Sequence, residues 1–109
     1  VTGLSMGGYG TWDLVQRQPN TWAAALPVCG GGDSHPEAVK PIQALPIWVF
    51  HGDADKAVPV TRSRDMVTAL KKVGNTVQYT EYPGVNHGSW TPAFAEPELL
   101  PFFFEGEKE

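Results

Sequence analysis

A serine in a glycine-flanked turn stands near the start of the chain, in the segment Gly3-Leu4-Ser5-Met6-Gly7. This G-x-S-x-G pattern between a strand and a helix is typical of a nucleophile elbow, a strained turn that points the serine hydroxyl outward. We therefore predict a positive φ at Ser5. The backbone N–H of Met6, first in the expected helix, would face the site and donate to an oxyanion. The chemistry indicated is attack of Ser5 on a carbonyl carbon.

A serine hydroxyl is a poor nucleophile at neutral pH unless a base accepts its proton and an acid orients that base. Two later loops offer such residues. Asp53 and Asp55 follow the apolar run 47–50, and His87 lies in a glycine-flanked loop after the run 77–82. Because parallel strands bring their carboxyl ends to one edge of a sheet, we expect these side chains to lie near Ser5.

Other reactive side chains have simpler interpretations. His51 stands at a strand end ahead of both acids, which favours a structural hydrogen-bonding role over the role of base. His35 lies in an unpatterned loop and is expected to be solvated. Cys29, a small residue beside a strand, is expected to be a core thiol.

Three aromatic residues are candidates for contact with a substrate. Trp90 follows His87 by three residues and is a candidate for lining an acyl or alcohol pocket. Trp12 and Tyr9 follow Ser5 closely and are candidates for the same pocket. Core packing is the alternative for each of them.

The glycines around Ser5 have a steric interpretation. We expect that side chains at Gly3 or Gly7 would collide with the neighbouring strand and helix. Gly8 and Gly10 extend this thin face and would let the helix pack closely against a sheet.

Strand and helix signals alternate along the chain. The first half is expected to contain a strand end at 1–2, a helix at 6–17, a strand at 22–28 and a loop with one turn of helix at 34–45. The second half is expected to contain a strand at 47–50, a helix from residue 60 that ends at Gly74, a strand at 77–82 and a closing helix at 96–105. This alternation predicts an α/β protein with a parallel sheet covered by helices.

Length and composition bound the possibilities. The 109 residues suffice for one domain, spanning 1–109, and 41% hydrophobic with 18% charged residues is typical of a globular core. The net charge of −4, with no basic cluster beyond Lys71 and Lys72, argues against nucleic acid and membrane surfaces as partners. No apolar run approaches the roughly 20 residues of a membrane span. The single cysteine excludes an internal disulfide and a multi-cysteine metal site.

Three motifs in order give a more specific indication: GLSMGGYGTWDL, WVFHGDADKAVPVTRSRDMVTALKK and VQYTEYPGVNHGSWTPAF. They resemble the carboxyl-terminal half of α/β-hydrolases in the group of carboxylesterases, phospholipase-type, feruloyl and polyhydroxyalkanoate-depolymerase-like esterases and predicted peptidases. The resemblance spans nearly the whole chain except 34–45 and the last few residues. It implies Ser5 as nucleophile, Asp55 as acid and His87 as base. Asp53 is then expected to cap backbone amides of its own turn.

The resemblance also implies a function. The chain would hydrolyse small-molecule carboxylic esters through an acyl-enzyme, with no cofactor and no metal. A serine peptidase of the prolyl-oligopeptidase type and a non-catalytic truncated fragment are the alternatives. Because the sequence opens at Val1 within a strand, we expect only part of the hydrolase fold, a second oxyanion donor from upstream, and self-association through the uncovered face. The compartment stays open, with secreted or periplasmic among the options.

Overall fold

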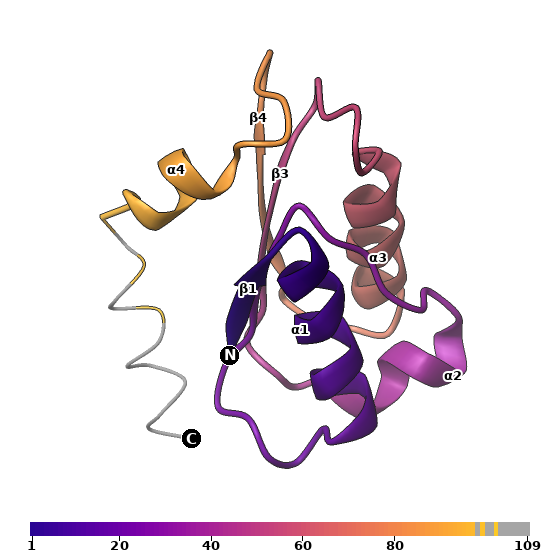
Figure 1. Cartoon of the computed structure of the whole chain (residues 1–109). Helices are drawn as coiled ribbons and strands as arrows, with labels where there is room; N and C mark the ends of the chain where they lie inside the picture. The colour runs from indigo at the N-terminus through magenta and orange to yellow at the C-terminus, as the bar shows by residue number, and fades with distance from the viewer. Residues whose placement is uncertain (98, 100–101, 103–109) are drawn as a thin grey trace.

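The computed structural model of the chain describes residues 1–97, 99 and 102, and its centre is a parallel sheet of four strands (Figure 1). The elements in chain order are β1 (Thr2–Leu4), α1 (Met6–Arg17), β2 (Leu26–Val28), α2 (Pro36–Val39), the 3-10 helix η1 (Lys40–Ile42), β3 (Trp48–Gly52), α3 (Thr61–Lys72), β4 (Gln78–Tyr82) and α4 (Trp90–Phe94).

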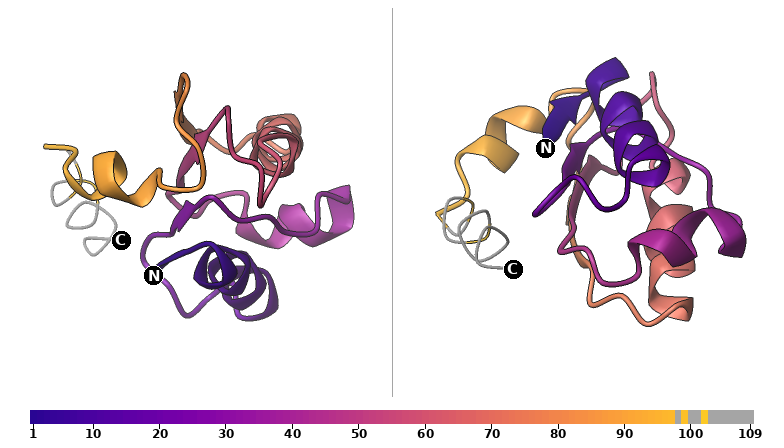
Figure 2. Two further views of the ribbon diagram at one scale, coloured as in Figure 1. Left: turned by 45° about the horizontal axis from the view of Figure 1, so that its top comes forward. Right: turned by 90° about the horizontal axis from the view of Figure 1, so that it is seen from below.

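The four strands lie in the sheet in their chain order, β1-β2-β3-β4, and each neighbouring pair is parallel. Connections between parallel strands are almost always right-handed, so consecutive neighbours carry their connecting helices on the same face. Figure 2 shows this arrangement, with α1, α2 and α3 on one side of the sheet and α4 on the other. The carboxyl ends of all four strands therefore point to one edge.

The two long helices form where a buried stripe recurs every three or four residues. In α1 the stripe includes Gly8, Trp12 and Val15. In α3 it runs through Ser63, Met66, Val67, Ala69 and Leu70, and Gly74 follows with φ 89°. A positive φ after the last turn is the usual end of a helix, and glycine adopts it without strain. Both predicted helices are confirmed.

The sheet separates two apolar clusters. Side chains alternate along β3, so Val49 packs with α1 and α3 whereas Trp48 and Phe50 face α4. The Trp48 and Phe50 rings stack with centroids 4.9 Å apart. All of β3 is buried, as expected for a strand covered on both faces.

Three segments differ from their expectation or lie partly outside the described residues. The strand expected at 22–28 is confined to β2, with one isolated bridge between Ala25 and Ile47 before it. The segment 34–45, expected to be a loop with one turn of helix, contains two short helices, α2 and η1, each with a proline in its first turn. The helix α4 lies between the loop of His87 and residue 96, where the sequence predicted no element, and most of the helix expected at 96–105 lies outside the described residues.

The glycine expectations hold only in part. A Cβ atom at Gly3 would collide with the backbone of Gly7, and one at Gly8 would lie 2.5 Å from the carbonyl oxygen of Val28. Gly7 and Gly10 have open space where a Cβ would stand, so the steric interpretation of these two residues is wrong. Close packing of α1 against the sheet depends on Gly8.

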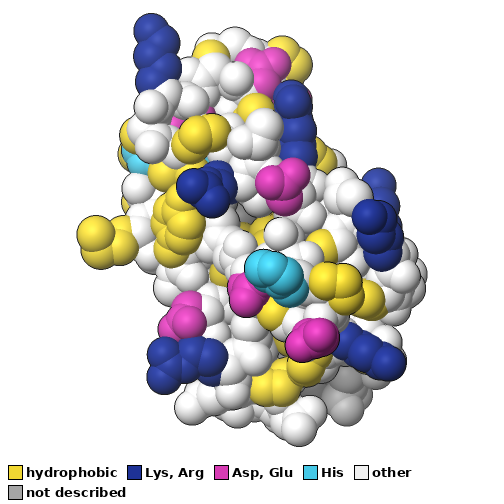
Figure 3. Space-filling view, turned by 90° about the vertical axis from the view of Figure 1, so that its right-hand side faces the viewer, with side chains coloured by type: hydrophobic (Ala, Val, Ile, Leu, Met, Phe, Trp, Pro, Cys, Tyr) yellow, Lys and Arg dark blue, Asp and Glu magenta, His cyan; other side chains and the backbone are white. Residues whose placement is uncertain are grey.

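The surface of α2 and α3 carries charges of both signs. Figure 3 shows this side of the molecule, where Lys and Arg side chains are dispersed among Asp and Glu. Within the described ranges, no helix combines the length and apolar character needed to cross a membrane.

Gly8→Ala and Gly10→Ala form a matched pair of variants in one helix. We expect Gly8→Ala to lower the free energy of unfolding by about 1–3 kcal/mol, because the backbone must move to admit the methyl group. Gly10→Ala should raise it by about 0.5–1 kcal/mol, because alanine favours the helix and meets no neighbour. Urea denaturation measures both. Equal effects in the two variants would contradict the proposed close packing at Gly8.

Candidate active site

The side chains predicted to do chemistry meet at the carboxyl edge of the sheet. Ser5 directly follows β1, Asp55 lies in the turn after β3, and His87 lies in the loop after β4. Figure 1 shows β3 and β4 side by side, so the turns that leave them are neighbours. Sheet topology alone therefore brings residues 82 positions apart to one place.

Ser5 has the backbone conformation expected of an elbow, with φ 52° and ψ −115°. A non-glycine residue in this region bears a strain of about 1–3 kcal/mol, which surrounding contacts must offset. The Ser5 N–H donates to the carbonyl of Val28 in β2 at 3.0 Å, and the Ser5 carbonyl accepts from the Tyr9 N–H at 3.1 Å. The elbow is thus fixed to the neighbouring strand and to the first turn of α1. The predicted positive φ is confirmed.

A continuous series of hydrogen bonds joins three side chains. Ser5 Oγ lies 2.6 Å from His87 Nε2, and His87 Nδ1 lies 2.7 Å from Asp55 Oδ2. An ionised carboxylate can only accept, so Nδ1 of His87 carries the hydrogen and Nε2 is left to accept from the Ser5 hydroxyl. The expected contacts are present, whereas the catalytic roles of these residues stay predictions.

The Asp55 side chain is completely buried and its oxygens are well supplied with donors. Oδ1 accepts from the backbone N–H groups of Ala57 at 2.9 Å and Val58 at 2.8 Å. Burial alone would raise the pKa of Asp55, but the hydrogen bonds from His87, Val58 and Ala57 outweigh it and lower this pKa. The carboxylate is therefore charged at neutral pH.

Asp53 is exposed, and its hydrogen bond is made to the turn after β4 and not to His87. Its Oδ1 accepts from the Gly84 N–H at 2.7 Å, so it joins the turn after β3 to the turn after β4. The expectation that it caps amides of its own turn is wrong. The Ala54 N–H adds a second link to the same turn through the Val85 carbonyl at 3.0 Å. These two bonds hold the loop of His87 against the turn of Asp55.

The two other histidines differ in setting. His51 is completely buried in β3 and both of its ring nitrogens have partners, which fits the structural role expected. His35 is exposed and its Nδ1 lies 2.6 Å from Asp33 Oδ1. The hydrogen bond with Asp33 raises the pKa of His35.

The three aromatic candidates differ in their exposure. The Trp90 ring meets His87 edge to face, with centroids 5.7 Å apart, and it is half-buried at the start of α4. Trp12 has no exposed surface and packs in the core beneath α1, so this structure leaves it no surface for a substrate to contact. Tyr9 is 38% exposed. Trp90 remains the better pocket candidate.

Met6 is the first residue of α1, a helix of 12 residues. The backbone N–H groups in the first turn of a helix have no carbonyl in a preceding turn to bond with, and the helix dipole favours negative charge there. The Met6 side chain is 85% exposed. Its N–H stays our predicted oxyanion donor.

Sequence reasoning missed the position of Cys29. This residue follows β2 with φ 44° and is completely buried. Its sulfur, a carboxylate oxygen of Asp55 and a ring nitrogen of His87 lie within 4.8 Å of one another. Burial raises the pKa of the Cys29 thiol. The Cys29 thiol therefore lies next to the side chains of Asp55 and His87.

These three ligand-type atoms do not make a convincing metal site. Asp55 and His87 already satisfy each other through a hydrogen bond. A metal would also require the Cys29 thiolate, and burial disfavours that form. The arrangement fits a hydrogen-bonded site better than a metal centre.

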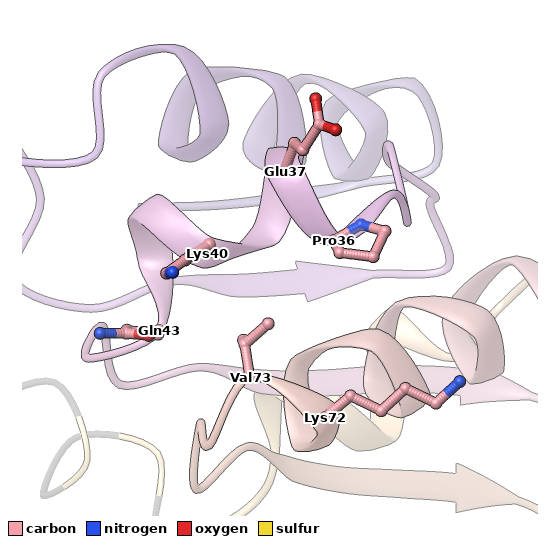
Figure 4. Close-up of a pocket in the computed structure, with 6 residues that line it drawn as sticks. All are labelled: Pro36, Glu37, Lys40, Gln43, Lys72 and Val73. Atoms are coloured by element: carbon pink, nitrogen blue, oxygen red, sulfur yellow. The ribbon is translucent and has the colours of Figure 1, made fainter.

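A surface hollow of about 460 Å³ lies elsewhere on the molecule. Figure 4 shows it between α2 with η1 and the end of α3. Its lining residues are Pro36, Glu37, Lys40, Gln43, Lys72 and Val73. None of them belongs to the hydrogen-bonded series, so this hollow is separate from the candidate active site.

Known proteins share this arrangement of sequence and fold. The model of the Dienelactone hydrolase family matches residues 1–98. The chain is 34% identical over 87 residues to serine carboxypeptidase-like 27 of Arabidopsis thaliana, covering 73% of this chain and 19% of that protein. It is 40% identical over 65 residues to esterase LipC of Mycobacterium tuberculosis, covering 51% and 16%. A solved thermostable esterase matches with a TM-score of 0.90 at 46% identity, covering 95% and 30%. The chain spans less than a third of each of these relatives.

The depressed pKa of Asp55 predicts a pH dependence of stability. Its folded-state pKa lies below the unfolded value of about 3.9, so the charged carboxylate stabilises the fold above that pH. This contribution should be lost as the pH falls below about 4 toward the folded-state pKa. Urea denaturation between about pH 3 and pH 7 should show a smaller loss in Asp55→Asn than in the wild type. Asp53→Asn, at an exposed carboxylate, is the control and should follow the wild type.

Proposed function

The chain belongs to the dienelactone hydrolase family and has the parallel sheet of the α/β-hydrolase fold, and we propose that it cleaves carboxylic esters as a serine hydrolase. The observation that carries this proposal is the hydrogen-bonded series from Ser5 through His87 to Asp55. These contacts supply the base and the orienting acid that a serine nucleophile needs. The similarity to proteins described as esterases supports the same reaction class.

The proposed reaction has two halves. Ser5 Oγ attacks the ester carbonyl while His87 Nε2 accepts its proton, and buried Asp55 stabilises the imidazolium that forms. The oxyanion of the tetrahedral intermediate accepts a hydrogen bond from the Met6 N–H, at the positive end of the α1 dipole. Collapse breaks the bond to the alcohol, which leaves with the proton from His87. Water then repeats the sequence on the acyl-enzyme and releases the acid and Ser5.

The remaining parts of the site bear on substrate choice. The Trp90 ring packs edge to face against His87, so it can contact either the alcohol leaving group or the acyl group of the ester. A second oxyanion donor in this fold comes from a loop after an earlier strand. We propose that such a donor lies outside these 109 residues.

Peptide hydrolysis is the alternative with a specific observation behind it, because one relative is described as serine carboxypeptidase-like. Esters and amides can be compared directly with a nitrophenyl ester and an aminoacyl nitroanilide. The esterase proposal is supported if the enzyme accelerates the ester more than the amide, each relative to its own uncatalysed hydrolysis. A truncated chain without activity would turn over neither substrate.

Self-association is a separate expectation that the sheet edge supports. Among the described strands β1 pairs only with β2, and Leu4 at this edge is 38% exposed. An unpaired strand edge is a template for pairing with another chain. We expect the sedimentation coefficient of the purified chain to rise with concentration. A monomer at every concentration would contradict this expectation.

A fluorophosphonate probe tests the nucleophile without requiring full turnover. We expect it to form an adduct on Ser5, located by mass spectrometry, and to leave Ser5→Ala unlabelled. Asp55→Asn should slow labelling by up to about 10⁴-fold, because an amide at this position favours the wrong tautomer of His87. Asp53→Asn is the matched control and should change the rate far less. Labelling of another serine, or equal effects of the two substitutions, would overturn the assignment.

A further inference from the structure

His51 is a second histidine close to the candidate acid Asp55. It has no exposed surface, and it comes from β3, the strand that leads into the turn of Asp55. Its Nε2 lies 2.8 Å from the Val58 carbonyl oxygen and 3.3 Å from Asp55 Oδ2. That oxygen is the one that accepts from His87. Asp55 Oδ2 is therefore close to a ring nitrogen of both His87 and His51.

The neighbours of His51 determine which ring nitrogen carries the hydrogen. A carbonyl oxygen can only accept, so Nε2 is the donor to Val58. Nδ1 lies 2.6 Å from Ser63 Oγ, whereas that hydroxyl is 3.5 Å from its other acceptor, the Gly30 carbonyl. The single hydroxyl hydrogen of Ser63 is thus directed to Nδ1 of His51. The contacts on both sides of the ring agree on one tautomer.

This tautomer acts on Asp55 through the turn that follows it. The Nε2–H holds the carbonyl of Val58, and the N–H of the same residue donates to Asp55 Oδ1 at 2.8 Å. Nε2 also lies 3.3 Å from Asp55 Oδ2, although its hydrogen is directed at the Val58 carbonyl. His51 therefore acts on the carboxylate through the turn, and its ring lies close to Oδ2. No contact to Ser5 or His87 is needed for this effect.

We propose that His51 is a positioning residue, whose Nε2–H holds the turn and carboxylate of Asp55 in the orientation that accepts the hydrogen bond from His87. The proposal rests on the proposed function, because it assigns His51 an effect on the reactivity of Ser5. It differs from a purely structural role, in which loss of His51 would lower stability and leave the reactivity of folded molecules unchanged.

Two substitutions separate the ring nitrogens. A glutamine amide reaches about as far as Nε2, so His51→Gln keeps a donor toward the Val58 carbonyl. An asparagine amide reaches only as far as Nδ1, so His51→Asn keeps the Ser63 contact and loses that donor. We expect His51→Asn to slow fluorophosphonate labelling of Ser5 by about 10- to 100-fold, a typical effect of losing a hydrogen-bond partner behind an active group. His51→Gln should restore most of the rate.

A double-mutant cycle tests whether His51 acts through Asp55. In the Asp55→Asn background, His51→Asn should slow labelling no further, because the group that it positions is already lost. Equal slowing in both backgrounds would overturn the proposal. Asn75→Ala is the matched control: Asn75 is buried and donates to the carbonyls of Ile42 and Leu45, away from the site. It should lower the urea midpoint without changing the labelling rate per folded molecule.

Nitrogen-15 NMR of the histidine rings gives a readout that requires no reaction. The His87 Nδ1–H resonance should be strongly downfield in the wild type and in His51→Gln, and shifted or lost in His51→Asn. An unchanged resonance in folded His51→Asn would overturn the proposal. If the wild type fails to label while the His87 resonance depends on His51 as expected, the proposed function fails and the positioning contact stands.

Discussion

The buried carboxylate of Asp55 is the constraint around which this end of the molecule is arranged. A charge removed from water is costly unless donors replace the lost hydration. Asp55 takes its donors from its own turn and from the loop after β4, and a third group, His51, faces it from β3. The turns after β3 and β4 must therefore lie together, which the parallel pairing of these strands and the link from Asp53 to Gly84 achieve. Ser5 reaches the same place because β1 ends at the same edge of the sheet.

Much of this arrangement follows from local sequence. Recurring buried positions defined α1 and α3, and the continuous apolar run of β3 indicated a strand covered on both faces. Strict alternation of strands and helices then implied a parallel sheet, so the convergence of Ser5, Asp55 and His87 was predictable. Choosing Asp55 over Asp53 required the spacing of a known motif, because both carboxylates occupy the same polar turn.

Tertiary packing decided what local sequence could not. Trp12 follows Ser5 by only seven positions, yet its place on α1 turns it into the core. Gly7 and Gly8 are adjacent and identical in type, but only Gly8 approaches the β2 carbonyl. The partner of Asp53 lies on another strand's turn, a contact that depends on sheet register. The position of Cys29 beneath the site likewise depends on β2 lying between β1 and β3.

The sequential order of the strands also has a consequence for synthesis. Because each strand pairs with the one made just before it, the sheet can grow from β1 to β4 as the chain leaves the ribosome. Ser5 and Asp55 would then be present before the loop of His87 has been made. The Ser5 hydroxyl of a nascent chain would lack its contact with His87 until β4 had paired with β3. In this order of assembly, the hydrogen bond between Ser5 and His87 forms later than the turns that hold Ser5 and Asp55.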